Sequence, residues 1–210
     1  MVQKELLPIK LFIFAKIVFC FISCTNTIEE KAITSSSFFV DTTSVPKDTV
    51  LSDKLTLDNG IYYLNKKPFS GYRKEMYDNG KPSLIGSYLI GMQHGTTRTY
   101  FANGKLKDSR SYKSNFSYGK HIGYWENGYQ KFEFYYLNDK REGLYKQWYI
   151  SGKPYAFLNY KDDKEDGMQY AWRENGKPYI NYEAKDGFRY GLQKSNLCYT
   201  LVDEKLKAAK

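Results

Sequence analysis

The sequence predicts an all-β protein, an elongated antiparallel meander of β-hairpins built from five 24-residue units and a starting half-repeat. Three observations predict it. A glycine recurs every 24 residues without insertion or deletion, and a second glycine follows each of these nine residues later. The runs between the glycines are rich in Tyr, Trp, Phe, Ile and Leu, which favour strands over helices.

The leading glycines define the units. A spacing that stays constant over five copies is the signature of a repeat array, in which each unit packs against its neighbours. Positions within a unit are counted here from its leading glycine, which is position 0. The leading glycines are Gly71, Gly95, Gly119, Gly143 and Gly167, and Gly191 begins a sixth unit that is not completed.

Each unit is expected to contain two turns. The first is centred on a structural turn glycine at position 9, which follows Asn or Ser; Asn-Gly favours a two-residue hairpin turn with positive φ at both residues. The second falls at positions 19 and 20, which hold residues that accept turn geometry. The turn glycines at position 9 are Gly80, Gly104, Gly128, Gly152 and Gly176.

Alternation of side chains along the strands predicts two different faces. Positions 5, 13, 15 and 17 are mostly apolar or aromatic, so we expect them, including Trp148 and Trp172, to share a buried face. Position 6 carries a second aromatic row, expected on the opposite face unless a bulge intervenes. An exposed row would bind a protein edge or sugar rings, and the alternative is simple packing. The row consists of Tyr77, Phe101, Trp125 and Tyr149 and ends in Arg173.

Residues 1–23 have the pattern of a lipoprotein signal peptide, with a basic start and an apolar run from Leu11 to Ile22. The run is shorter than the roughly 20 apolar residues that span a bilayer. Residues 21–24 resemble a lipobox, so Cys24 is the predicted lipidation site, with an uncleaved anchor helix as the alternative. We expect a lipid-anchored protein of the cell envelope, most simply at the outer membrane of a Gram-negative bacterium.

The rest of the chain divides by composition. Residues 24–56 are rich in Ser and Thr, contain no Tyr or Trp, and are expected to form a flexible tether. All 21 tyrosines lie between Tyr62 and Tyr199, which places the repeat array at residues 57–194. Residues 195–210 are predicted to be a C-terminal cap or tail, with a final strand and a short helix as the alternatives.

The sequence offers no constellation typical of an enzyme. It has two histidines, His94 and His121, and three cysteines without a C-x-x-C pair. The acidic run 162–166 lacks the spacing of a calcium loop and falls on a predicted turn. We therefore expect no catalytic residue, no metal and no cofactor.

Positive charge is spread evenly through the array. Residues 57–194 hold 23 Lys and Arg against 15 Asp and Glu. A solvated face that keeps a sheet soluble explains this distribution best, and anionic partners such as lipid headgroups or wall polymers come second. Nucleic acid is not expected as a partner of an exported protein.

Several phrases of the array resemble a known family. YDNGKP (77–82), YISGKP (149–154) and RENGKP (173–178) resemble bacterial MORN-repeat variants of the YwqK antitoxin type, and NGIYYLNKKPFSG (59–71) resembles the half-repeat that often starts such arrays. The resemblance implies a non-enzymatic sheet that serves as a surface for partners. We expect a lipid-anchored scaffold for an unknown protein partner; the alternatives are a glycan or cell-wall binding module and an antitoxin-like partner of a toxin.

Overall fold

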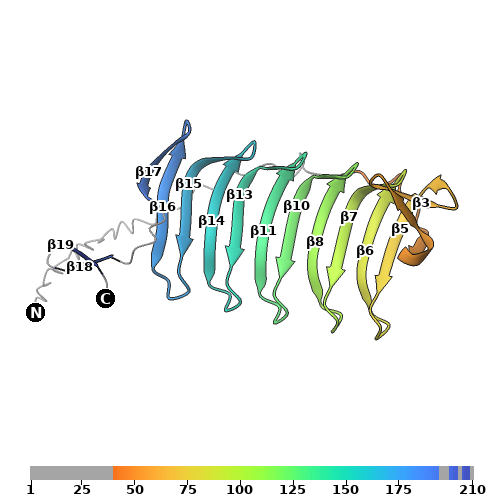
Figure 1. Ribbon diagram of the computed structural model, residues 1–210, viewed down its shortest axis with the longest axis horizontal. Helices are drawn as coiled ribbons and strands as arrows, with labels where there is room; N and C mark the ends of the chain where they lie inside the picture. The colour runs from red at the N-terminus through yellow and green to blue at the C-terminus, as the bar shows by residue number, and fades with distance from the viewer. Residues whose placement is uncertain (1–39, 194–198, 203–204, 209–210) are drawn as a thin grey trace, which may run out of the picture. The chain divides into compact units, whose positions relative to one another are not determined.

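The computed structural model describes residues 40–193, 199–202 and 205–208. The predicted signal peptide at residues 1–23, the lipidation site Cys24 and the first part of the tether, residues 24–39, lie outside the described residues. The described chain is built of strands, and its main feature is one 14-stranded sheet (Figure 1). The expected all-β meander of hairpins is therefore confirmed.

The strands of the main sheet follow one another in chain order, so that neighbours in sequence are neighbours in space. Short strands β9 (Phe116–Ser117) and β12 (Lys140–Arg141) extend two of the ladders. The long strands are β5 (Gly71–Met76), β6 (Pro82–Leu89), β7 (Met92–Tyr100), β8 (Leu106–Lys113), β10 (Gly119–Tyr124), β11 (Gln130–Leu137), β13 (Gly143–Trp148), β14 (Pro154–Lys161), β15 (Lys164–Trp172), β16 (Pro178–Lys185) and β17 (Phe188–Leu192).

The pairing within each unit repeats with the same register. Position 0 pairs with position 17, as in Gly71 with Tyr88 and Gly143 with Tyr160. Nearer the first turn, position 4 pairs with position 13 but position 5 with position 11, so the second strand holds one extra residue as a bulge. The period of the glycines is thus also the period of the hydrogen-bond pattern.

The first turn differs from the expected two-residue form. The N–H of Tyr77 donates to the carbonyl of Lys81 at 2.8 Å, and the N–H of Gly80 donates to that of Tyr77 at 2.9 Å. Of Asn79 and Gly80, only the glycine has a positive φ, +75°. The loop therefore has three residues, a type I turn closed by a left-handed glycine. Asn79 Oδ1 accepts the N–H of Lys81 at 3.0 Å, which holds the asparagine in ordinary turn geometry.

The second turn has the two-residue primed form, and its predicted position is correct. Both central residues have positive φ, for example Ile90 at +50° and Gly91 at +77°. The flanking residues Leu89 and Met92 pair directly. The twist of this turn matches the twist of the strands that it joins.

The register corrects the expected composition of the two faces. Residues that pair across a hairpin point their side chains to the same face of the sheet. Within a unit the position numbers of paired residues add to 17, for example 0 with 17 and 4 with 13. Even positions on the first strand of the hairpin therefore share a face with odd positions on the second. The assignment of position 5, with Trp148 and Trp172, to the face of positions 13 to 17 is wrong because parity reverses across the hairpin. Positions 0, 2, 4, 13, 15 and 17 form what we call the tyrosine face, after Tyr88, Tyr112, Tyr136 and Tyr160. Positions 1, 3, 5, 12, 14 and 16 form the lysine face, after Lys74, Lys107, Lys120, Lys131 and Lys146.

The core lies on the tyrosine face as a layer of side chains that pack along the sheet. Phe134 stacks on Tyr145 of the next unit, with ring centroids 3.4 Å apart, and Tyr145 meets Tyr160 edge to face at 5.7 Å. The Arg141 guanidinium lies 4.0 Å from the centroid of the Tyr160 ring. Each unit therefore buries its rings against its neighbours, as expected for a repeat array.

The first unit is covered by the segment that precedes it. β1 (Thr49–Leu51) pairs in parallel with β5 and opens the main sheet, and a 3-10 turn, Ser52–Lys54, follows it. Val45 is only 6% exposed. The expected end of the flexible tether at residue 56 is therefore wrong. Residues 40–56 belong to the folded part, where β1 pairs with β5 and the Val45 side chain is buried.

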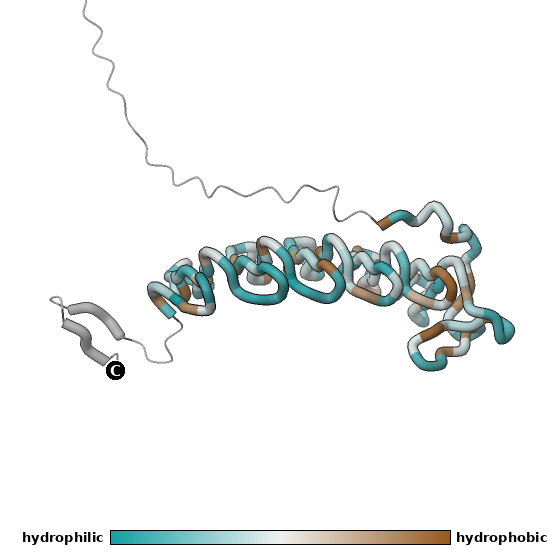
Figure 2. The backbone as a smooth tube through the Cα atoms, turned by 90° about the horizontal axis from the view of Figure 1, so that it is seen from above, coloured by the Kyte–Doolittle hydropathy of each residue, from teal (hydrophilic) through white to brown (hydrophobic). Residues whose placement is uncertain are grey.

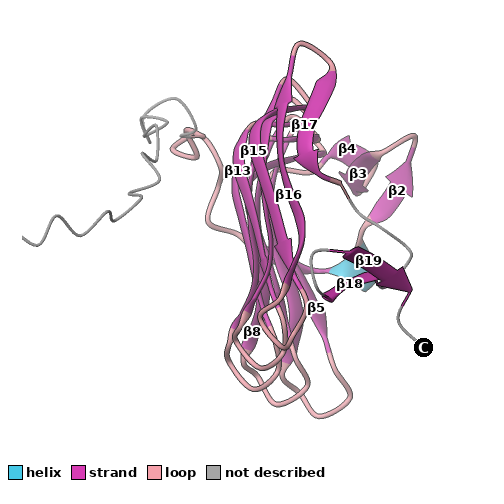
Figure 3. Ribbon diagram, turned by 90° about the vertical axis from the view of Figure 1, so that its left-hand side faces the viewer, coloured by secondary structure: helices cyan, strands magenta, loops and turns pink. Residues whose placement is uncertain are grey.

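The half-repeat forms a small sheet of its own, made of β2 (Thr56–Asp58), β3 (Ile61–Leu64) and β4 (Lys67–Pro68). The ring of Tyr62 meets Tyr88 edge to face at 5.0 Å, and Tyr88 is 1% exposed. Figure 2 and Figure 3 show this small sheet and residues 40–48 on opposite sides of the main sheet. The half-repeat therefore packs over the tyrosine face of the first unit.

The other end of the main sheet is β17, whose five residues are all exposed. After it, β18 (Tyr199–Val202) and β19 (Lys205–Ala208) form a two-stranded sheet. Of the strand and the helix expected for this C-terminal segment, its described residues form strands. Its role as a cap stays a prediction.

Candidate functional site on the lysine face

The predicted binding row at position 6 lies at the start of the first turns, along one rim of the sheet. The Tyr77 hydroxyl donates to the carbonyl of Tyr100, 23 residues ahead, at 2.8 Å. Trp125 Nε1 and the Tyr149 hydroxyl make the same bond to the next unit, at 3.1 and 2.9 Å. These rings are half-buried, so their first role is to join units.

The two other members of the row differ from this scheme. Phe101 has no polar side-chain atom, and the Lys107 ammonium lies 6.0 Å from its ring centroid. Arg173 is exposed and lies 5.8 Å from the ring centroid of Tyr179. Arg173 belongs to the last complete unit, and the position 23 residues ahead of it lies outside the described residues.

Turn residues reinforce the same rim. Asn79 Nδ2 donates to the carbonyl of Ala102 at 2.8 Å, and Asn127 Nδ2 repeats this bond at 2.8 Å in a later unit. The Lys81 ammonium donates to the carbonyl of Asn103 at 2.8 Å. The turn glycines that allow this geometry have φ values of +75° at Gly80, +90° at Gly104, +95° at Gly128, +81° at Gly152 and +84° at Gly176. This rim is a structural ladder.

Positions 5 and 6 were expected on opposite faces, but both lie on the lysine face. Trp148 at position 5 meets Phe157 at position 14, with ring centroids 5.6 Å apart. Tyr149 at position 6 meets Tyr155 at position 12, at 5.1 Å. β13 ends at Trp148, so Tyr149 already belongs to the turn and strand alternation does not extend to it.

Rings of the last two units form a continuous cluster on this face. Phe157 packs between Trp148 and Trp172, at 5.6 and 5.3 Å, and Tyr170 stacks on Trp172 at 5.9 Å. The rings are half-buried apart from that of Tyr155, which is 37% exposed. We call this cluster the aromatic patch; it consists of Trp148, Tyr149, Tyr155, Phe157, Tyr170, Trp172 and Tyr179.

Sequence reasoning missed most of the aromatic patch. It used only the rows at positions 5 and 6, whereas Phe157 comes from position 14 and Tyr155 and Tyr179 from position 12. A signal was present, because position 12 changes from polar residues in the first three units to tyrosine in the last two. A polar position that turns aromatic at one end of an array marks a local difference in surface chemistry.

Two tyrosines of the aromatic patch, Tyr149 and Tyr179, have raised pKa values. Burial raises the pKa of Tyr179, and the hydrogen bond with Tyr155 raises it further. Burial and the neighbouring Tyr155 ring also raise the pKa of Tyr149. The patch therefore offers ring faces and, at Tyr149 and Tyr179, neutral hydroxyls to a partner.

Charges are arranged differently on the two faces. On the tyrosine face Arg73 pairs with Glu75 at 2.8 Å and Arg110 pairs with Asp108 at 3.2 Å. On the lysine face Lys120 pairs with Glu133 at 2.8 Å. The Lys131 ammonium lies instead over the Trp125 ring, 4.4 Å from its centroid. The lysine face thus places ammonium groups beside aromatic rings.

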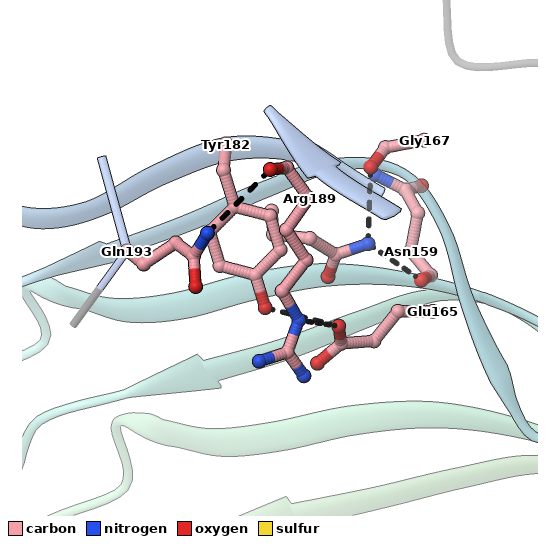
Figure 4. A network of polar contacts seen from close by, with 7 residues as sticks. Asn159, Glu165, Gly167, Tyr182, Arg189 and Gln193 are labelled. Atoms are coloured by element: carbon pink, nitrogen blue, oxygen red, sulfur yellow. Dashed lines mark hydrogen bonds and ion pairs between the residues drawn. The ribbon is translucent and has the colours of Figure 1, made fainter. Parts of the chain in front are cut away.

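An open hollow of about 1110 Å³ lies at the C-terminal end of the tyrosine face. It forms where position 17, a tyrosine in the first four units, becomes Ala184. One of its carboxylates is paired on both sides: Glu165 Oε2 accepts from the Tyr182 hydroxyl and from Arg189 Nε, both at 3.0 Å (Figure 4). Burial and this bond to Glu165 raise the pKa of Tyr182 to about 12. The hollow is also lined by the carboxylates of Asp162, Asp166 and Asp186 and by the ammonium groups of Lys161 and Lys164.

The histidines have structural surroundings. His94 Nε2 lies 2.9 Å from the carbonyl of Asp41, and His121 Nε2 lies 2.8 Å from that of Ser111. Burial lowers the pKa of His121. Within residues 40–193 and the C-terminal hairpin, no three His, Cys, Asp or Glu side chains are grouped to hold a metal ion, and no helix is long and apolar enough to cross a membrane.

Comparisons with known proteins do not reveal a family. No family model matches the chain, and no curated protein matches it. Among solved structures, the chain is similar to part of a crystal structure of the GtfA/B complex bound to UDP and GlcNAc, with 13% sequence identity and a TM-score of 0.24. The match covers 70% of this chain and 29% of that one.

Proposed function

We propose that the chain is a lipid-anchored, non-enzymatic scaffold that binds a protein partner at the cell envelope. The observation that carries the proposal is the aromatic patch, seven rings gathered on the lysine face, of which Tyr155 is exposed and the others are half-buried. Tyr and Trp are enriched at the energetic centres of protein interfaces because they bury large areas with little loss of conformational entropy.

The neighbouring lysines support the same proposal. Lys146 lies on the same face as the patch, on β13 and directly opposite Phe157, and Lys131 lies on that face on the neighbouring strand β11. An aromatic centre beside cationic groups suits a partner with an apolar surface flanked by carboxylates. Tyr149 and Arg173 of the sequence-predicted row contribute at the rim of the patch, while Tyr77, Phe101 and Trp125 lie in earlier units.

Site-specific photo-crosslinking in cells tests the proposal. A photoreactive phenylalanine analogue at Tyr155 should give a discrete protein adduct, because this ring is the most exposed of the patch. The same analogue at Tyr129, which is 56% exposed on a turn of the rim, is the matched control and should give none. Equal adducts from both positions would contradict a specific site.

A glycan or cell-wall binder is the second candidate, because ring faces of Trp and Tyr also stack on sugars. Co-sedimentation with isolated cell-wall polysaccharide separates the two candidates. Retention of the wild type and loss of retention in Trp172→Ala, without a protein adduct from position 155, would favour the glycan binder.

The anchor is tested separately. Radiolabelled palmitate should enter the wild-type chain and not Cys24→Ala, because acylation needs the thiol. Two acyl chains give stable membrane attachment. Equal labelling of both proteins would rule out Cys24 as the lipidation site.

A further inference from the structure

β17 ends the main sheet with an edge that is uncovered within the described chain. It pairs with β16 from Lys185 opposite Phe188 to Asn181 opposite Leu192. The two-residue turn makes the pair next to it, Lys185 with Phe188, a hydrogen-bonded pair, and such pairs alternate along the ladder. The backbone groups of Arg189 and Gly191 therefore point away from β16.

The side chains of this strand are divided between the two faces. Phe188, Tyr190 and Leu192 lie on the lysine face, and they are 65%, 59% and 49% exposed. Arg189 lies on the tyrosine face, where its charge is neutralised by Glu165 at 3.0 Å. An exposed apolar edge strand is a template for pairing with another strand, and folded proteins usually block it with charge, proline or a cover.

The edge is self-complementary when it is paired antiparallel about Tyr190. In that register Phe188 lies opposite the partner's Leu192, Tyr190 lies opposite the partner's Tyr190, and Arg189 lies opposite the partner's Gly191. Apolar side chains meet apolar side chains on one face, and no two arginines are directly opposed on the other. Arg189 and Gly191 of each chain supply the outward-pointing groups that the new ladder needs, and the Arg189 carbonyl exchanges the long 3.5 Å bond that it accepts from Gln193 Nε2 for a ladder bond.

We propose that two copies of this chain associate through β17, antiparallel and two-fold symmetric about Tyr190. The symmetry is closed, so pairing stops at the dimer and does not continue into a filament. The main sheet becomes continuous through both copies, and the exposed side chains of the edge become interior to it. This association does not depend on the function proposed for the aromatic patch.

A charge introduced at position 190 tests the proposal, and the measurement is the mass of the particle in analytical ultracentrifugation. The full chain in non-ionic detergent should sediment as two chains per particle. Tyr190→Lys and Tyr190→Glu alone should each sediment as one chain, because like charges face each other across the axis. An equimolar mixture of the two variants should recover two chains per particle. Tyr129→Lys changes a tyrosine of similar exposure, 56%, on a turn and should stay at two chains.

A wild type of one chain per particle would overturn the proposal, and so would a dimer that survives both charged variants. The first result would indicate that residues 194–210 or a different protein cover the edge. The second would place the contact elsewhere on the chain.

Disulfide trapping tests the register. In a chain with its three cysteines replaced by serine, Tyr190→Cys should form a covalent dimer on oxidation, because Cα atoms of such a pair lie about 4.5 Å apart. Phe188→Cys should not, because the two copies of residue 188 would be offset by roughly 14 Å along the strands. Trapping at 188 and not at 190 would show a shifted register and overturn the two-fold axis at Tyr190.

Discussion

The two ends of the main sheet are built from the same repeat and have opposite surroundings. At the first unit, Tyr88 is 1% exposed beneath Tyr62 and Phe69 of the preceding segment. At the last unit the equivalent position is Ala184, which is also buried, at 4% exposed, but carries no ring, and the strand after it is exposed throughout. The repeat therefore keeps position 17 in the core at both ends, while the flanking chain decides how much side chain is packed beyond it.

The largest expected effect is at the covered end. Tyr88→Ala should lower the free energy of unfolding by about 3 to 5 kcal/mol, because it removes a ring that is buried on all sides. Glu183→Ala, which removes an exposed side chain of the last unit, should change it by less than about 0.5 kcal/mol. Urea denaturation of both variants, followed by circular dichroism, measures the difference. Equal losses would show that the two ends are equally packed.

A matched pair of glycines isolates the contribution of the half-repeat. Gly91 and Gly187 both occupy position 20 and have φ of +77° and +82°, so alanine is strained at either by roughly 1 to 2 kcal/mol. A Cβ at Gly91 would also meet the carbonyl oxygen of Tyr62 at 2.8 Å and the Ile61 side chain, whereas nothing lies within 4 Å at Gly187. Gly91→Ala should therefore lower the melting temperature more than Gly187→Ala.

Deletion of residues 40–68 gives the control for that pair. In the shortened chain the two alanine variants should become equivalent, because the atoms that a Cβ at position 91 would meet are gone. A difference that persists would have to come from the turns themselves.

A smaller difference in the free energy of unfolding is expected between substitutions at position 6 inside the array and in its last complete unit. Tyr149→Phe removes the hydroxyl that bonds to the carbonyl of Trp172 and should cost about 0.5 to 1.5 kcal/mol. Arg173→Ala, at the same position of the last complete unit, should cost less than about 0.5 kcal/mol because Arg173 is exposed. Chemical denaturation checks both, and the reverse order would contradict the role of this row in joining units.

The smallest effect should come from protonation in the middle of the array. Burial lowers the pKa of His121 below its ordinary value of 6.5, so the folded chain binds fewer protons than the unfolded chain in that range. Stability should be complete above about pH 6.5 and should fall as the pH drops through the lowered pKa. His121→Tyr, which copies Tyr145 of the next unit, should flatten the profile measured by thermal unfolding between pH 7 and 5.

Much of the fold was predictable because glycines, which adopt positive φ without strain, recur at fixed positions of the repeat. The glycine period predicted the meander, and position 20 predicted a turn where Gly91 has φ of +77°. The type of the first turn was not predictable from Asn-Gly alone, since it depends on Asn79 Oδ1 accepting a bond two residues ahead. The error in the faces followed from carrying the parity of one strand across the hairpin to the next.

The candidate site was only partly predictable. Tyr149 and Arg173 were named from the sequence as binding residues; Tyr149 belongs to the aromatic patch and Arg173 borders it. The bonds of Tyr77 and Trp125 to carbonyls 23 residues ahead are contacts between units, which a single unit does not reveal. The order of residues 40–56 was also hidden, because a Ser/Thr-rich segment that pairs with an existing strand needs no strong pattern of its own.

The serial order of the strands gives the sheet a mechanical property. A force applied at the C-terminal end pulls β17 away from β16 across the ladder, so hydrogen bonds break one after another and not all at once. Each unit holds 24 residues and releases roughly 80 Å of extended chain when it detaches. Under a constant pulling force the array should therefore unfold from its C-terminal end in five steps, each of which extends the chain by nearly the same length.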